Sequence, residues 1–213
     1  MTKVYTSIIG GVDNLSDAPL LNEIQFHCYT DSDIKAKNYS VFKEKVGSNK
    51  WLESRKFKIL SHHYQKGKSL WIDGRVEVKS NVIEFLEKNE NHDFILFKHP
   101  HSDTIQAEAE RCLSLGILKD DYLVKTQLDK YEKLGFSDHK LMAGGIILRN
   151  NCQMVKSINE LWWKELNEFP TRDEISLPYV LWKLGIEVNV LDLDIFNNPY
   201  FKFNKRRLGE RNT

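Results

Sequence analysis

The sequence has few cysteines, and their arrangement excludes one common kind of site. The three residues, Cys28, Cys112 and Cys152, are odd in number and widely spaced, and none belongs to a CxxC or CxxH pair. A structural zinc site is therefore not expected, because such sites use closely spaced ligand pairs. We interpret the cysteines as buried free thiols of a reducing compartment.

The sequence also lacks an excess of charge of one sign and any long apolar run. The 31 Lys and Arg residues nearly balance the 30 Asp and Glu residues, so no net field favours nucleic acid or a membrane surface. No apolar run approaches the ~20 residues that span a bilayer. Residues 1–11 lack the apolar centre of a signal peptide. We expect a cytoplasmic protein, unless the chain was cut from a longer polypeptide with further domains.

What the sequence does contain is the composition of an ordinary globular protein. Hydrophobic residues make up 41% and charged residues 29%, and we expect one domain over residues 1–213. The 5 Trp and 8 Tyr residues are generous for this length. Such rings are often core residues, but sugar-binding sites also use them, because a flat apolar ring suits the C–H face of a pyranose.

Short runs rich in β-branched and aromatic residues predict strands that are buried on both faces, because apolar and polar residues do not alternate in them. Helical stretches separate these runs. Strands that alternate with helices predict an α/β fold with a mixed, mostly parallel central sheet flanked by helices. The expected strands are residues 4–9, 24–29, 69–72, 94–97, 145–148 and 188–191.

Capping signals and apolar stripes predict the helices. Asn81, with a glutamate three residues later, is typical of a capping box. Asp103 is expected to cap a second helix that ends before a glycine at position 116. An apolar stripe over residues 155–169 predicts a third helix. Residues 173–184 predict a fourth, in which Pro178 should cause a kink or a restart.

The most informative polar segment follows the predicted strand 69–72. Ligands of open α/β sheets bind beyond the carboxyl ends of strands, so Asp73 lies where a site is expected, and Gly74 permits close approach. If the chain stayed extended, Asp73, Arg75 and Glu77 would share one face and could hold a divalent cation and a phosphate. A strand-to-turn Asp-Gly with solvated charges is the common alternative.

Small and acidic residues follow the first two predicted strands. The run from Thr6 and Ser7 to Gly10 and Gly11 suits a loop along a nucleotide, although it is neither GxGxxG nor a phosphate-binding loop. Asp31 ends the second strand. Its carboxylate could accept a hydrogen bond from a base N–H or a ribose hydroxyl, or could cap a turn.

Two further groups of polar residues have both a functional and a structural interpretation. His99 and His101 flank a proline and could ligate a metal, but a zinc triad needs a third ligand that the sequence does not reveal. Exposed loop histidines are the alternative. Arg172, Asp173 and Glu174 begin a predicted helix. Acidic residues favour helix N-termini in any case, whereas the arginine is less well explained by capping.

Short motifs occur in a characteristic order along residues 4–185. They are Tyr5-Thr6, Gly10, Asp13, Cys28-Tyr29-Thr30-Asp31, Lys58, His62, Trp71-Ile72-Asp73-Gly74, His99, Glu108, Ile147-Leu148-Arg149, Trp162 or Trp163, Arg172-Asp173-Glu174-Ile175-Ser176 and Tyr179. In this order they resemble the glycosyltransferase-like domain of plant mucilage-related proteins, which also occurs in bacterial and viral glycan gene sets. The sequence also resembles the N-terminal domain of a chlorella-virus glycosyltransferase that acts on capsid glycans.

The resemblance implies a GT-A fold, a UDP-sugar donor of a hexose or deoxyhexose, a glycan or glycoprotein acceptor, and Mn²⁺ or Mg²⁺ at the diphosphate. Asp73 would be the metal ligand. The usual DxD motif reads Asp73-Gly74-Arg75 here, so the second carboxylate is missing and phosphate, water or a histidine must complete the shell. The run Asp192-Leu193-Asp194 also spells DxD, but it follows the last strand, and we do not expect it to hold this metal.

The resemblance also implies roles for the other residues. Lys58 would neutralise phosphate, and Asp173 or Glu174 would be the base of an inverting reaction or the stabiliser of a retaining one, which the resemblance favours. The predicted residues are catalytic Arg172, Asp173 and Glu174; donor-binding Thr6, Ser7, Gly10, Asp31, Lys58, His62, Asp73, Gly74 and Arg75; and sugar- or acceptor-binding His99, His101 and Trp162.

Other interpretations stay open at this point. The missing second carboxylate also fits a non-catalytic module that binds a nucleotide sugar or a glycan. A metallohydrolase based on His99 and His101 would need a full ligand set. The basic residues from Lys202 to Arg211 are interpreted as a solvated end, as a clamp over a diphosphate, or as a linker to a missing domain. A viral member of the family would act in the host cytoplasm.

Overall fold

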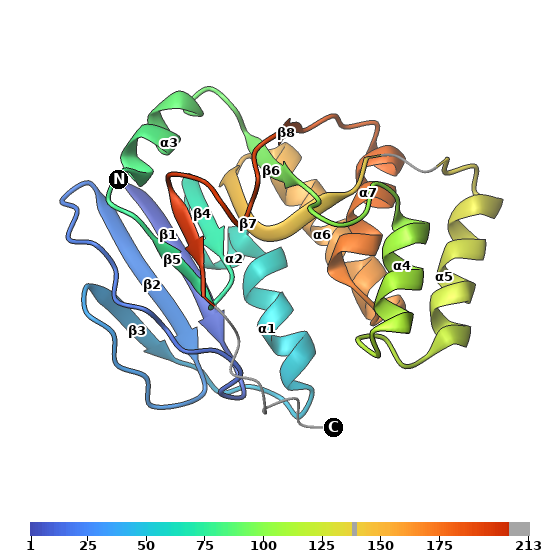
Figure 1. The fold of residues 1–213 in the computed structure, drawn as a ribbon, viewed down its shortest axis with the longest axis horizontal. Coiled ribbons are helices and arrows are strands. Elements are labelled where there is room, and N and C mark those ends of the chain that lie inside the picture. The colour runs from blue at the N-terminus through green and yellow to red at the C-terminus, as the bar shows by residue number, and fades with distance from the viewer. Residues whose placement is uncertain (138–139, 205–213) are drawn as a thin grey trace.

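A seven-stranded sheet organises the computed structural model, which describes residues 1–137 and 140–204 (Figure 1). Four neighbouring strand pairs of this sheet are parallel, and the two pairs that include β7 are antiparallel. The prediction of a mixed, mostly parallel sheet is therefore confirmed. In spatial order the strands are β3 (Tyr39–Lys43), β2 (Ile24–Thr30), β1 (Thr2–Ile8), β4 (Lys68–Ile72), β7 (Met142–Asn150), β6 (Phe94–Lys98) and β8 (Asn189–Leu191).

Both faces of the sheet are apolar and each carries a hydrophobic core. Successive residues of a strand point to opposite faces. Tyr5 and Trp71 accordingly belong to one core, and their neighbours Val4 and Leu70 belong to the other. This arrangement explains why the central strands read as unbroken apolar runs.

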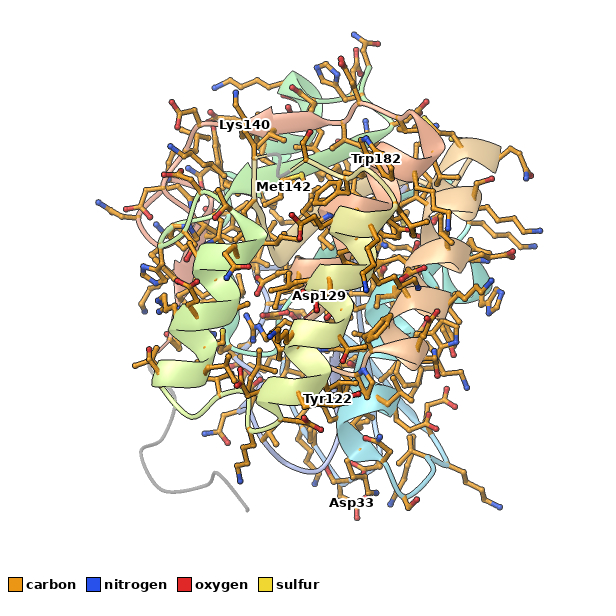
Figure 2. All side chains as sticks on the ribbon, turned by 90° about the vertical axis from the view of Figure 1, so that its right-hand side faces the viewer. Asp33, Tyr122, Asp129, Lys140, Met142 and Trp182 are labelled. Atoms are coloured by element: carbon orange, nitrogen blue, oxygen red, sulfur yellow. The ribbon has the colours of Figure 1, made fainter. Side chains whose placement is uncertain are left out.

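The two faces are covered by different elements (Figure 1). Helices α1, α4, α5, α6 and α7 contribute to the core that contains Tyr5, whereas α3 and a two-stranded ribbon of β5 and β9 cover the core that contains Leu70. Figure 2 shows α4 and α5 side by side, with Tyr122 and Asp129 on α5. The bounds are α1 (Lys50–Ile59), α2 (Ser61–Tyr64), α3 (Val82–Lys88), α4 (Ile105–Ser114), α5 (Asp121–Lys133), α6 (Gln153–Glu168), α7 (Asp173–Leu184), β5 (Val76–Val78) and β9 (Phe201–Phe203).

Helix α4 is capped by a residue other than the one predicted. The Thr104 hydroxyl accepts the N–H of Ala107 at 3.1 Å, so Thr104 is the N-cap, and the prediction of Asp103 was wrong. The Asp103 carboxylate lies instead 3.6 Å from the Lys98 ammonium. The helix ends as predicted, before Gly116, whose φ of 63° is favourable for glycine.

Two other helix predictions also need correction. Asn81 precedes α3, but its side chain makes no capping hydrogen bond, so the predicted capping box does not form. Pro178 lies inside α7 (Asp173–Leu184), which continues through it. The predicted restart therefore does not occur, and the kink stays a prediction.

Three further sequence-based expectations concern the cysteines, membrane-spanning helices and the basic C-terminal residues. Cys28 and Cys112 are buried and Cys152 is partly buried, and all three are free thiols. Within residues 1–137 and 140–204, no helix combines the length and the apolar composition that crossing a bilayer requires. Of the basic C-terminal residues, Lys202 pairs with Glu77 at 3.2 Å, and those from position 205 onward lie outside the described residues.

Replacing Thr104 by alanine should lower the free energy of unfolding by about 1 kcal/mol, because the N-cap hydrogen bond is lost. The matched variant Asp103→Ala should change it by less than about 0.5 kcal/mol, because only an exposed ion pair is removed. Urea unfolding followed by circular dichroism compares the two variants. Equal losses would contradict the assignment of the cap.

Candidate active site

The carboxyl ends of the parallel strands β1, β2 and β4 lie at one edge of the sheet. Strand β7 runs in the opposite direction, so its first residues lie at this same edge. The N–H of Asp73, just after β4, donates to the carbonyl of Gly145 at 2.8 Å. This is the edge at which α/β sheets bind ligands.

Asp73 begins a turn and does not continue the strand. Its carbonyl accepts the N–H of Val76 at 2.8 Å. Asp73, Arg75 and Glu77 therefore do not share one extended face, and that prediction was wrong. The Arg75 guanidinium lies over the ring of Phe203, 5.2 Å from its centroid.

The two oxygens of the half-buried Asp73 carboxylate have different surroundings. Oδ1 accepts a hydrogen bond from Trp71 Nε1 at 3.2 Å. Oδ2 lies 3.5 Å from the point that a Cβ on Gly145 would occupy, and the described residues place no hydrogen-bond donor on it. One oxygen is therefore held in place and the other is open to a ligand.

Gly74 allows the loop after β1 to pack against the Asp73 turn. A Cβ on Gly74 would lie 2.9 Å from Ile8 Cγ1 and 3.1 Å from Asp13 Cβ, which is closer than carbon atoms pack. The close approach predicted at Gly74 is therefore made by other residues of the protein.

Asp31 closes the same loop. Its Oδ1 accepts the N–H of Gly10 at 2.9 Å, and its Oδ2 accepts a hydrogen bond from Lys50 at 2.6 Å. Burial raises the pKa of Asp31, but these two donors outweigh it and bring the pKa below its ordinary value. Thr6 and Ser7 precede this loop and belong to β1. Ser7 Oγ donates a hydrogen bond to the carbonyl of Ser54 in α1 at 3.1 Å.

A buried ion pair joins α1 to α7. The Lys58 ammonium donates to Asp173 Oδ2, and Arg55 Nε lies 3.5 Å from Oδ1. A Cβ on Gly144 would lie 2.6 Å from Lys58 Nζ, so the absence of a side chain there makes room for the ammonium. Burial raises the pKa of Asp173, but Lys58, Arg55 and Arg172 outweigh it and hold the pKa well below its ordinary value.

Glu174 lies beside this pair and is held from two sides. Its Oε1 accepts the N–H of Gly144 at 3.0 Å, and its Oε2 pairs with Arg172. Burial raises the pKa of Glu174, but the Arg172 and Lys58 charges and the Gly144 N–H together outweigh it, and the net shift is downward. The side chain of Glu174 is 12% exposed and that of Asp173 only 3%, so Glu174 is the carboxylate nearer to the surface.

His99, Glu108 and Glu174 offer ligand atoms within 4.8 Å of one another. However, His99 Nδ1 accepts the N–H of Ser102 at 3.1 Å. Burial lowers the pKa of His99, so the ring is neutral and its single proton lies on Nε2, 3.8 Å from Glu108. A metal would need the lone pair of that nitrogen. The trio is therefore a poor metal site, and because His101 does not belong to it, it gives no support to a metallohydrolase based on His99 and His101.

The chain matches the family described as TOD1/MUCI70, glycosyltransferase-like domain, over residues 38–206. It belongs to this family. The predicted likeness to plant mucilage-related glycosyltransferase-like proteins is thus confirmed, and the likeness to a chlorella-virus enzyme stays a prediction. Asp73 and the Arg172–Glu174 segment lie within the residues matched to TOD1/MUCI70, whereas Gly10 and Asp31 precede them.

Two individual proteins show how far these similarities extend. The "Probable hexosyltransferase MUCI70" of Arabidopsis thaliana is 27% identical over 133 residues, which cover 57% of this chain and 23% of that protein. The chain thus matches less than a quarter of the length of that TOD1/MUCI70 relative. Apo mouse xyloside xylosyltransferase 1 superposes with a TM-score of 0.47 and 10% identity, covering 91% of this chain and 86% of that chain.

Two predicted site residues lie elsewhere in this TOD1/MUCI70 domain. His62 belongs to α2, whose Ser61 bonds to Asn151 beyond the far end of β7, so His62 lies at the opposite edge of the sheet from Asp73. Trp162 is fully buried and its Nε1 donates to the carbonyl of Asp173 at 2.9 Å. It cannot stack on a sugar, and both predictions were wrong.

Sequence reasoning assigned no role to Arg149, which is completely buried. Its Nη2 donates to the hydroxyl of Tyr5 and to the carbonyl of Lys58, both at 2.6 Å, and its Nη1 donates to Asn159 at 3.2 Å. Burial lowers the pKa of Arg149. An arginine directly after the predicted apolar strand 145–148 was the available signal, because a buried cation needs such partners.

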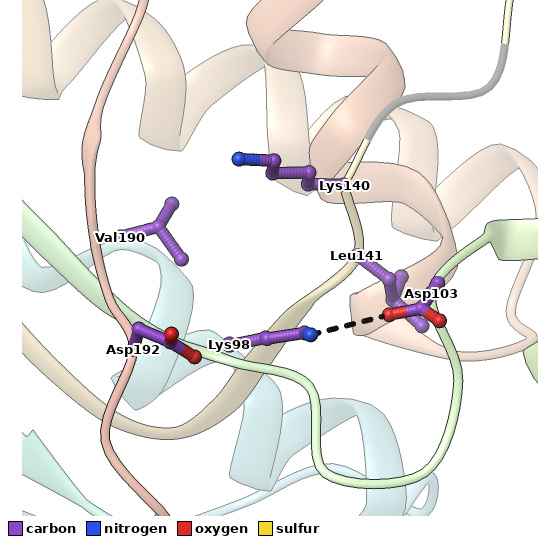
Figure 3. A pocket seen from close by; sticks show the side chains of 6 residues that line it. All are labelled: Lys98, Asp103, Lys140, Leu141, Val190 and Asp192. Atoms are coloured by element: carbon purple, nitrogen blue, oxygen red, sulfur yellow. Dashed lines mark ion pairs between the residues drawn. The ribbon is translucent and has the colours of Figure 1, made fainter.

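A pocket of about 220 Å³ lies farther along the same edge, at the ends of β6 and β8 (Figure 3). Two ammonium groups and two carboxylates border it, so the charges of its lining balance. The two aspartates of the second DxD motif have different surroundings. Asp192 lines this pocket, whereas Asp194 Oδ1 accepts a hydrogen bond from the N–H of Phe196 at 2.8 Å. The lining residues are Lys98, Asp103, Lys140, Leu141, Val190 and Asp192.

The variant Asp173→Asn should lower the free energy of unfolding by about 3–5 kcal/mol, because it leaves the buried Lys58 ammonium without its carboxylate. Lys58→Met should cost less, because Arg55 still lies 3.5 Å from Asp173. The double variant should lose at least about 1 kcal/mol less than the sum of the two single losses. Urea unfolding of the four proteins tests this, and additive losses would show that the pair is not coupled.

Proposed function

We propose that this domain is a GT-A-type glycosyltransferase that moves a hexose or deoxyhexose from a UDP-sugar to a glycan or glycoprotein acceptor. Membership of a glycosyltransferase-like family and the likeness to a probable hexosyltransferase support glycosyl transfer. One observation carries the proposal. The open oxygen of Asp73 and the held carboxylate of Glu174 lie on either side of Gly144 and Gly145, at the ligand-binding edge of the sheet.

The diphosphate needs positive charge, and the structure distinguishes the two predicted cations. Lys58 is buried and already pairs with Asp173. Arg75 has no carboxylate partner among the described residues, and its buried Nε lacks a hydrogen bond. Arg75 is therefore the better phosphate-binding group, and Lys58 acts by keeping Asp173 in place.

Mn²⁺ or Mg²⁺ fits the donor set at Asp73. Such ions are commonly held by one or two carboxylates, with phosphate and water as the other ligands, and Asp73 Oδ2 is open. When bound, the ion neutralises the charge that builds up on the departing diphosphate. Arg75 adds a fixed positive charge beside it, and the loop closed by Gly10 and Asp31 would hold the uridine.

Glu174 is the carboxylate that we assign to the reacting sugar. Asp173 is more deeply buried and bound to Lys58, so its role is to position the start of α7. Arg172 and the Gly144 N–H keep Glu174 ionised and fixed. An ionised carboxylate can stabilise the oxocarbenium-like sugar, and we propose a retaining reaction.

The proposal predicts that UDP with Mn²⁺, at millimolar concentration, raises the melting temperature by at least about 2 °C, because the ligand binds only the folded state. Asp73→Asn should lose the Mn²⁺-dependent part of this shift. Asp192→Asn, an aspartate at the end of another strand, should keep it. A thermal-shift panel with UDP, GDP and CMP, each with and without Mn²⁺, measures this. If UDP with Mn²⁺ leaves the melting temperature of the wild-type protein unchanged, the proposal is contradicted.

Glu174→Gln should keep the UDP shift and lower the release of UDP from UDP-hexoses at least about 100-fold, because the charge facing the sugar is removed. A coupled assay of UDP release over a panel of UDP-sugars and acceptors checks this. Normal turnover in the variant would rule out the assigned role.

A non-catalytic module that binds a nucleotide sugar is the second candidate. The observation that favours it is the arginine at position 75, where the usual motif has its second carboxylate. UDP binding by the wild type, without release or transfer over the whole panel, would support this candidate against the enzyme.

A further inference from the structure

Two phenylalanine rings of the C-terminal segment lie beside Asp73. The rings of Phe196 and Phe203 meet edge to face, with centroids 5.0 Å apart and planes at 84°. Phe203 Cζ lies 3.3 Å from the point that a Cβ on Gly145 would occupy, and Asp73 Oδ2 lies 3.5 Å from that point. Phe203 and the proposed metal ligand therefore border one small space, and Phe196 packs against Phe203.

The β5–β9 ribbon holds these rings in place. Phe201 is fully buried in the core and lies on the same face of β9 as Phe203, two residues on. The turn before the strand is fixed by Asn198, whose Oδ1 accepts the N–H groups of Tyr200 and Phe201 at 3.0 and 2.9 Å. Phe203 is thus positioned by the fold.

Polar groups flank the aromatic pair on both sides. The Arg75 guanidinium lies 5.2 Å from the centroid of Phe203, and its Nε has no hydrogen-bond partner in the described part of the chain. On the other side, the exposed imidazole of His101 lies 5.6 Å from the ring of Phe196 at an angle of 33°. Phe196 itself is 39% exposed. The surface combines an apolar ring with hydrogen-bonding groups at its margins.

We propose that Phe196, Phe203 and His101, here called the aromatic platform, bind a pyranose ring of the acceptor glycan. A pyranose has an apolar C–H face that packs on an aromatic ring, while its hydroxyl groups reach polar side chains at the edge. Arg75 and His101 are such side chains. The inference rests on the proposed function and adds the acceptor subsite to it.

The two glycines of β7 distinguish the acceptor from the donor sugar. Neighbouring residues of a strand face opposite sides of the sheet. Gly144 faces Lys58 and Asp173, and its N–H binds the Glu174 assigned to the donor sugar, whereas Gly145 faces Phe203. The aromatic platform therefore lies at the Gly145 end of the site, next to Asp73 and the diphosphate, and one residue along β7 from the Gly144 that binds Glu174, so an acceptor on it can approach the donor sugar.

Saturation-transfer NMR on the full chain, with UDP and Mn²⁺ present, tests the platform. The probes are methyl glycosides of glucose, galactose, mannose, rhamnose and xylose. We expect ring C–H signals from at least one of them, and about fivefold weaker binding in Phe196→Leu. Phe42→Leu is the matched control, because Phe42 is 40% exposed on the edge strand β3 and should leave the signals unchanged.

Separate readouts distinguish the failure of this inference from that of the proposed function. Phe196→Leu should keep the wild-type melting temperature and the wild-type UDP shift, because the ring is exposed and lies outside the donor site. If UDP binds and no glycoside gives a signal, or Phe196→Leu binds like the wild type, the platform is overturned and the donor site stands. If UDP gives no shift, the proposed function fails, and a Phe196-dependent glycoside signal would then mark a plain glycan-binding surface.

Discussion

The ion pair between Lys58 and Asp173, packed over Gly144, is the contact on which the candidate site depends. It joins α1, α7 and β7, three elements far apart in the chain. A buried ammonium or carboxylate is costly alone, so the two charges stabilise the fold only together. Because the pair fixes the first turn of α7, it also fixes Arg172 and Glu174 at the edge of the sheet. The charge of Glu174 is available at the surface because Asp173 is neutralised behind it.

Around this pair, buried side chains of a strand and a helix bind backbone carbonyls of the paired residues. Arg149 binds the carbonyl of Lys58 from the end of β7, and Trp162 binds the carbonyl of Asp173 from α6. Both contacts hold the backbone of the paired residues. Gly144 faces these helices and Gly145 faces the β5–β9 ribbon, so neighbouring residues of one strand contact the carboxylate assigned to the donor sugar and the ring assigned to the acceptor.

The reliability of the sequence-based predictions followed the strength of the local signal. The central strands were recognised because burial on both faces leaves unbroken apolar runs. Strand β3 was missed because Tyr39–Lys43 is a largely exposed edge strand without such a run. Helix α1 was missed because its sequence carries five charged residues in ten positions and no apolar stripe. Trp162 was misassigned because an aromatic residue suits a core and a sugar site equally well.

By itself, the sequence determined the fold class and the edge of the sheet at which Asp73 lies, because strand burial and the polar residues that end a strand are local patterns. Only the tertiary structure decided which charges are already paired. Lys58 and Asp173 are 115 positions apart, and no local pattern reports that one neutralises the other. The packing of Phe203 against Gly145 is likewise a contact between distant segments. The sequence therefore indicated where the site lies, and the packing decided which of its side chains can meet a ligand.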